Sequence, residues 1–127
     1  MKATMKKRKK PITESFGYAF EGILTGIRNE RNMKIHCVAI IFVTLAGTLF
    51  QITATQWCIC LLLFALVISL ELVNTAVEAV VDLVTEERKP LAKIAKDTAA
   101  GAVLFASLAA VIIGCIIFIP YLADLFL

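Results

Sequence analysis

The chain has 127 residues, of which 60% are hydrophobic and only 18% charged, and its mean hydropathy is +0.87. A globule this short and this apolar would leave large hydrophobic patches in water, so the composition excludes a water-soluble monomer and indicates a lipid bilayer as solvent. The net charge of +3 comes from the first ten residues, which hold six of the 13 basic side chains.

Residues 1–11 form a basic tail. Such a run next to membrane segments predicts attraction to anionic lipid headgroups and retention in the cytoplasm. No folded nucleic-acid reader accompanies the tail, so we expect no nucleic-acid partner. The rest of the chain, residues 12–127, is predicted to form a single membrane domain.

An amphipathic helix is predicted over residues 12–33. Its apolar side chains recur at helical spacing, namely at Ile12, Phe16, Phe20, Ile23 and Ile27. At about 100° per residue these five positions fall within roughly an 80° arc, opposite a polar side that includes Tyr18. The pattern predicts a helix that lies on the cytoplasmic face of the membrane. A plain membrane anchor is the alternative, and Tyr18 on the polar side favours a functional helix.

Three apolar runs follow, and each is long enough to cross a bilayer. The predicted spans cover residues from about 35–52, 57–84 and 98–122. Basic residues precede the first span and occupy the loop after the second, which places both regions and the amino terminus in the cytoplasm. The sequence therefore predicts an all-α integral membrane protein with one amphipathic surface helix and three transmembrane helices.

The second span ends with polar side chains on one helix face: Glu71, Asn74, Thr75, Glu78 and Asp82. Charged residues in a span cost on the order of 2.5 to 3.5 kcal/mol each, so they normally face a protein interior or a wet cavity and mark function. The structural alternative is hydrogen bonding of Asn74 and Thr75 to neighbouring helices, with Asp82 at a solvated helix end. Carboxylates on a rigid helix suit cation binding and proton abstraction.

Other polar residues flank the spans. Glu30, before the first span, could supply a second cation ligand. Lys96 and Asp97 open the third span, and the cations near them suit either phosphate binding or snorkelling at the membrane boundary. His36 has no second histidine to share a metal with, so we expect an interfacial polar residue.

These residues together resemble the small prokaryotic diacylglycerol kinase family. The resemblance is carried by the run from Glu71 to Asp82, by Lys96-Asp97 and by Gly101-Ala-Val-Leu. It implies a homotrimeric membrane kinase, with three spans per subunit, in the cytoplasmic membrane of a bacterium. It also implies that the enzyme uses ATP and Mg²⁺ to phosphorylate a lipid alcohol at the cytoplasmic surface.

The resemblance implies a role for each matching position. Glu71 matches the general base, Glu30 and Glu78 match the pair that holds magnesium, and Asn74 matches a residue that supports them. The positions that match nucleotide contacts, in a site assembled between subunits, are Tyr18, Glu30, Glu78, Glu87, Arg88, Lys89, Lys96 and Asp97.

The segment from Asn29 to His36, together with Phe20-Glu21-Gly22, resembles the undecaprenol kinase branch of that family. The leading hypothesis is therefore a kinase that makes undecaprenyl phosphate. A diacylglycerol kinase making phosphatidic acid is the close alternative. A small proton-coupled transporter and a noncatalytic membrane adaptor would also explain carboxylates in a span.

Overall fold

The computed structural model describes residues 9–127, which form four α-helices. They are α1 (Ile12–Asn29), α2 (Arg31–Phe50), α3 (Ala54–Val84) and α4 (Pro90–Phe126). The predicted all-α architecture is confirmed, and α2, α3 and α4 are each long and apolar enough to cross a membrane. Most of the predicted basic tail lies outside the described residues.

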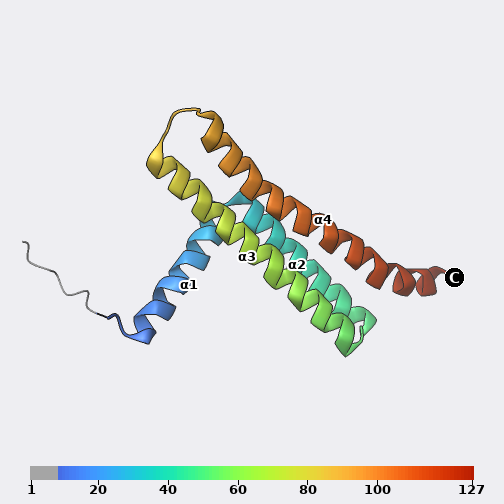
Figure 1. Ribbon diagram of the computed structural model, residues 1–127. Helices are drawn as coiled ribbons and strands as arrows, with labels where there is room; N and C mark the ends of the chain where they lie inside the picture. Colours follow the sequence, from blue (N-terminus) through green and yellow to red (C-terminus); the bar gives the residue numbers. More distant parts are fainter. Residues whose placement is uncertain (1–8) are drawn as a thin grey trace, which may run out of the picture.

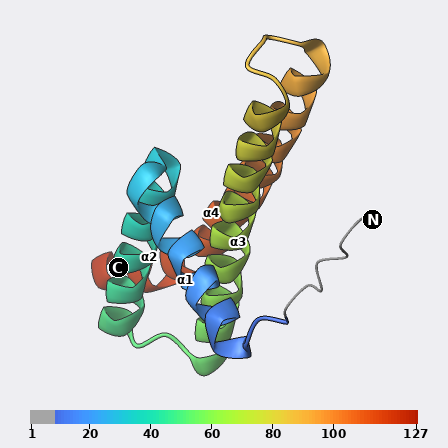
Figure 2. The same ribbon diagram turned by 90° about the vertical axis from the view of Figure 1, so that its left-hand side faces the viewer.

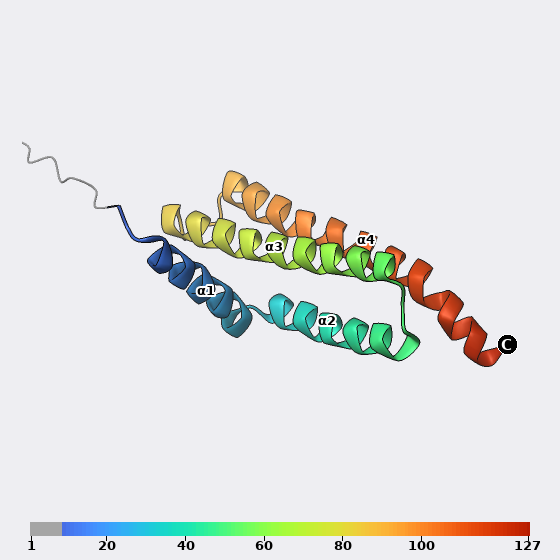
Figure 3. The same cartoon turned by 90° about the horizontal axis from the view of Figure 1, so that it is seen from below.

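The three long helices run side by side, with α3 between α2 and α4 (Figure 3). The most extensive packing is between α3 and α4, and α3 packs less extensively against α2. The helix α1 leaves this bundle at a steep angle (Figures 1 and 2), and only its carboxyl-terminal part meets α2 and α3. This arrangement fits an amphipathic helix joined to spans that run in another direction.

The predicted surface helix 12–33 is too long, because the chain turns at Glu30. The backbone of Glu30 is extended (φ −101°, ψ 120°), and its N–H donates to the carbonyl of Gly26 at 3.0 Å, which closes α1 before α2 begins. A Cβ on Gly26 would lie 2.9 Å from Leu72 Cδ2. The absence of a side chain at Gly26 therefore lets the last turn of α1 lie directly on α3.

A tight turn joins α2 to α3. Gln51 ends α2 in the left-handed conformation (φ 51°). This single residue turns the chain away from the axis of α2. Thr53 and Gln56 then form a capping box, in which each side chain accepts a hydrogen bond from the other residue's backbone N–H. This box starts α3 at Ala54, three residues before the predicted span.

The fourth helix begins well before its apolar run. Pro90 occupies the first turn of α4. Backbone N–H groups in a first turn have no partner within the helix, so the N–H that proline lacks costs no hydrogen bond there. Lys93 then pairs with Asp97 one turn later, so charged residues in the first turns support the helix. The predicted span 98–122 is therefore only the apolar part of a helix that extends from Pro90 to Phe126.

The opposite end of the bundle is fixed by a small aromatic cluster. The Tyr121 hydroxyl donates to Gln56 Oε1 at 2.7 Å, and the Tyr121 ring stacks on Phe50 with centroids 5.8 Å apart. Pro120 lies inside α4, and the helix bends near there (Figure 1). Residues from α2, α3 and α4 thus hold one another at the end remote from the acidic residues.

Candidate active site

The acidic face of α3 becomes more buried toward the middle of the bundle. Glu71 is 1% exposed and Asn74 is 5% exposed, whereas Glu78 is half-buried and Asp82 is exposed. Asn74 Nδ2 donates to Glu78 Oε1 at 3.4 Å, one turn further along the helix. The result is one polar strip that runs from the protein interior to the α3–α4 loop.

A polar pocket of about 250 Å³ surrounds the inner end of this strip. Its polar side chains come from three helices: Asn32 and His36 on α2, Glu71 and Asn74 on α3, and Ser107 on α4. Its other walls are apolar residues of α2 and α4. The pocket is therefore built by the bundle as a whole and not by one helix.

Three buried side-chain oxygens within residues 9–127 have no hydrogen-bond partner, and all three belong to residues that line this pocket. They are Glu71 Oε2, Asn74 Oδ1 and Ser107 Oγ. A buried polar atom without a partner costs about 1–3 kcal/mol, and more if it is charged. Their convergence on one pocket indicates a site that binds a small polar group carrying a hydrogen-bond donor.

His36 is the side chain of α2 that faces the buried carboxylate. Its Nε2 lies 3.5 Å from Glu71 Oε2, within ion-pair distance but not aligned as a hydrogen bond. The expectation that His36 is an interfacial polar residue is incomplete, since its ring lines the pocket beside Glu71. Ser107 was not singled out from the sequence at all, because its spacing carries no signal for a contact with another helix.

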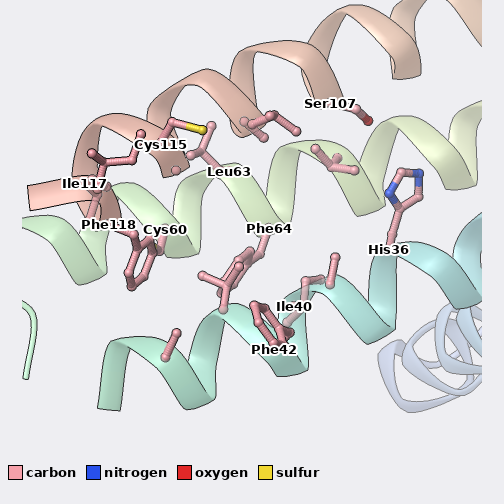
Figure 4. Close-up of a pocket in the computed structure, with 18 of the residues that line it drawn as sticks. His36, Ile40, Phe42, Cys60, Leu63, Phe64, Ser107, Cys115, Ile117 and Phe118 are labelled. Atoms are coloured by element: carbon pink, nitrogen blue, oxygen red, sulfur yellow. The ribbon is translucent and has the colours of Figure 1, made fainter. Parts of the chain in front are cut away.

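An apolar groove of about 590 Å³ adjoins the polar pocket. It lies between α2 and α4 with α3 as its floor, and it shares His36 and Ser107 with the pocket. Figure 4 shows His36 and Ser107 at the same end of the groove, with Cys60, Ile117 and Phe118 at the other. The groove is thus a hydrocarbon-lined cleft with polar groups at one end.

A second group of charges lies where α3 and α4 approach their connecting loop. Lys96 Nζ lies 2.6 Å from Asp82 Oδ1, which joins the two helices. Asp97, predicted to contact nucleotide, pairs with Lys93. In the loop itself, Lys89 Nζ lies 3.8 Å from Glu87 Oε2, and both side chains are exposed.

The remaining predicted site residues are not joined to the acidic face within one chain. Tyr18 is 52% exposed on α1, where Lys10 Nζ lies 4.5 Å from its ring centroid. Glu30 is half-buried at the α1–α2 junction, and Arg88 is exposed in the loop. In the described part of the chain, no group of three His, Cys, Asp or Glu residues is placed to hold a metal ion.

Comparison with known proteins decides between the classes that the sequence left open. The family model described as prokaryotic diacylglycerol kinase matches residues 17–118, which include the whole acidic face and the polar pocket. The chain belongs to the prokaryotic diacylglycerol kinase family. It is accordingly a multi-pass membrane protein of a family of ATP-dependent lipid kinases, and the predicted family is confirmed. Membership favours the kinase over the transporter and the adaptor.

Individual relatives of the diacylglycerol kinase family support this assignment. The chain is 45% identical to the undecaprenol kinase of Bacillus subtilis, over 86% of this chain and 89% of the relative. It is also 45% identical to a diacylglycerol kinase of Synechocystis, over 87% of this chain and 64% of the relative. Identity to the diacylglycerol kinase of Escherichia coli K12 is 31%, over 84% and 87% of the two chains.

Proposed function

We propose that this protein transfers the γ-phosphate of ATP to undecaprenol and so makes undecaprenyl phosphate. The observation that carries the proposal is the junction of the polar pocket with the apolar groove, at His36 and Ser107. A long-chain alcohol has the same two parts, a hydrocarbon chain and a terminal hydroxyl. The junction therefore matches the substrate in shape and in polarity.

Glu71 acts as the general base. Its Oε2 is buried, lies in the polar pocket that adjoins the apolar groove and has no hydrogen-bond partner, so it is available to accept the proton of a bound hydroxyl. Ser107 lines the same pocket, and its O–H can donate to the hydroxyl oxygen, which leaves the hydroxyl proton for Glu71. Asn74 supports the site from the same pocket. Phosphoryl transfer depends mainly on such positioning and on neutralising the phosphate charges.

The groove supports an isoprenoid chain as the occupant. Apart from His36 and Ser107, its lining is made of hydrocarbon and cysteine side chains. Diacylglycerol carries two ester groups next to its hydroxyl, and each would need a polar partner when buried. An isoprenoid carries none. Because identity to the undecaprenol kinase and to the Synechocystis diacylglycerol kinase is equal, this lining is the observation that favours undecaprenol.

The nucleotide is held at the cytoplasmic end of the acidic strip. Glu30 and Glu78 supply the carboxylate oxygens for Mg²⁺, which typically uses one or two protein carboxylates together with substrate phosphates. The Asn74 hydrogen bond to Glu78 fixes that carboxylate and fits this role. When bound, Mg²⁺ neutralises phosphate charge and polarises the transferred group. Contacts to the nucleotide come from Tyr18, Glu87, Arg88, Lys89, Lys96 and Asp97.

The active particle is a homotrimer in the bacterial cytoplasmic membrane, with the amino terminus in the cytoplasm. Support for shared sites comes from α1, which projects from the bundle (Figure 1) and on which Tyr18 is exposed. The basic residues of the α3–α4 loop support the orientation, since cytoplasmic loops concentrate Lys and Arg.

The test is ATP-dependent phosphate transfer by purified protein in mixed micelles with magnesium, with undecaprenol and diacylglycerol compared side by side. We expect strong preference for undecaprenol and loss of transfer when magnesium is chelated. Preference for diacylglycerol would retain the mechanism and overturn the assigned substrate. Transfer to neither lipid by folded protein would contradict the proposed function as a whole.

A further inference from the structure

Phosphorylation of an alcohol releases a proton, and the proposed base has no exit of its own for it. The Glu71 side chain is 2% exposed, and it lies in the middle of a helix of 31 residues that spans the membrane. A carboxyl group that kept the proton could not act as base in the next cycle. The proton must therefore leave Glu71 through a neighbouring group.

His36 is placed to receive it. Its Nε2 lies 3.5 Å from Glu71 Oε2, and its side chain is 18% exposed, so it touches both the buried carboxyl group and the outside of the bundle. Asn32, one turn earlier on α2, is exposed and lines the same pocket. The pocket thus leads from Glu71 past His36 to the cytoplasmic end of α2.

We propose that His36 is the proton relay that returns Glu71 to its ionised state after each phosphate transfer. This inference rests on the proposed function. His36 acts through Glu71 and is a positioning and relay residue, not a group that contacts the transferred phosphate. Histidine suits the task because its charge changes between about pH 5 and 8.

The step balances without any further reactant. The hydroxyl O–H bond breaks as its proton moves to Glu71 Oε2, a new O–P bond forms, and the bond between the γ-phosphorus and the β–γ bridging oxygen breaks to release ADP. Glu71 then passes the proton to Nε2 of neutral His36. The imidazolium then loses its Nδ1 proton to water, which leaves a neutral ring protonated at Nε2. Exchange of the proton from Nε2 to Nδ1 through water returns the ring to the tautomer that accepts the next proton.

No other titratable group among the described pocket residues competes for this role. From α3 the pocket presents Glu71 and the neutral Asn74 to the ring, and from α4 it presents Ser107 and apolar side chains. Neighbouring Lys34 on α2 is exposed and outside the lining. Besides Glu71 itself, His36 is therefore the one titratable side chain among the described residues that line the pocket.

The test measures kcat and KM for full-length protein in mixed micelles, comparing wild type with His36→Ala, His36→Gln and Val38→Ala. We expect both His36 variants to lose kcat by on the order of 10²-fold, the usual contribution of a proton-transfer group. KM for ATP should change by less than about twofold, because no nucleotide contact is assigned to His36. Val38→Ala, on the exposed side of α2, keeps wild-type kinetics.

Added imidazole separates a relay from a structural role. It should restore transfer by His36→Ala, and the restored rate should rise from roughly pH 6 to pH 8 as imidazole becomes neutral. Glutamine at position 36 can donate a hydrogen bond but cannot titrate, so wild-type kcat in His36→Gln would overturn the relay. So would a folded, nucleotide-binding His36→Ala protein that imidazole does not rescue. If wild type itself transfers no phosphate, it is the proposed function that fails.

Discussion

At the scale of single residues, the polar pocket is defined by oxygens that lack partners. Glu71, Asn74 and Ser107 each bury one such oxygen in the pocket, although proteins rarely leave these groups unmatched. If stability were the only requirement, apolar side chains would be expected at these three positions. Their presence beside a hydrocarbon-lined groove is best explained by a bound hydroxyl that donates to Glu71 and accepts from Ser107.

Ser107→Ala separates binding from stability. Because Ser107 Oγ has no partner in the substrate-free protein and its burial costs about 1–3 kcal/mol, its removal should not lower the free energy of unfolding. It should raise KM for the lipid alcohol by about three- to tenfold, the equivalent of one lost hydrogen bond. Steady-state kinetics and thermal unfolding in micelles measure both effects.

Ser69→Ala is the matched control, since Ser69 is an exposed serine of α3 outside the pocket. It should leave KM unchanged. An unchanged KM in Ser107→Ala would mean that the hydroxyl of the substrate does not contact Ser107.

The residues of the acidic face were predictable from the sequence because their spacing places them on one side of one helix. Glu71, Asn74 and Glu78 required only the helical period and the rule that charges inside a span mark function. His36 and Ser107 join Glu71 across helices far apart in the sequence, and no local pattern reports such a contact. The groove was unpredictable for the same reason.

At the scale of helices, the structure depends on close approach at two glycines. Gly26 lets the end of α1 lie on Leu72 of α3, and Gly47 lets the end of α2 lie on Trp57. The hydropathy of the sequence predicted these helices, but it placed their ends where the apolar runs end. The observed limits follow capping and pairing instead: Thr53 with Gln56 begins α3, while Pro90 begins α4.

Gly47→Ala tests the contact between α2 and α3. A Cβ at Gly47 would lie 2.8 Å from Cη2 of Trp57, so the rigid indole or the turn must shift. We expect a loss of about 1–3 kcal/mol in the free energy of unfolding, the usual effect of overpacking. Denaturation in micelles, followed by circular dichroism, measures it.

Gly22→Ala provides the comparison, because no described atom lies within 4 Å of the position its Cβ would occupy. In that exposed helical position alanine should stabilise α1 by roughly 0.5–1 kcal/mol. Equal stability of the two variants would show that the Trp57 contact does not constrain the turn.

At the scale of the whole molecule, one chain leaves most of its apolar surface uncovered. Among the residues in the most apolar stretch of each long helix, only 11% are buried in α2, 22% in α3 and 17% in α4. Lipid or further copies of the chain must cover the rest. The predicted nucleotide contacts Tyr18 and Arg88 are also exposed, and we propose that a neighbouring subunit completes the site around them.

Two measurements test the proposed trimer. Native mass spectrometry in detergent should give the mass of three chains of 13.9 kDa. If the sites are shared, chains carrying Tyr18→Ala and chains carrying Glu78→Gln, each impaired alone, should regain activity when assembled together. A fully active monomer, or mixed oligomers no more active than their parents, would contradict shared sites.

The most direct measurement is phosphate transfer by Glu71→Gln, which keeps the size of the side chain but removes its negative charge and its basicity. We predict a fall in kcat of on the order of 10²- to 10⁴-fold, with nucleotide binding and unfolding temperature close to wild type. Glu14→Gln, at an exposed carboxylate of α1, should behave as wild type. Near-normal transfer by Glu71→Gln would contradict the assignment of the buried carboxylate as the base that activates the lipid hydroxyl.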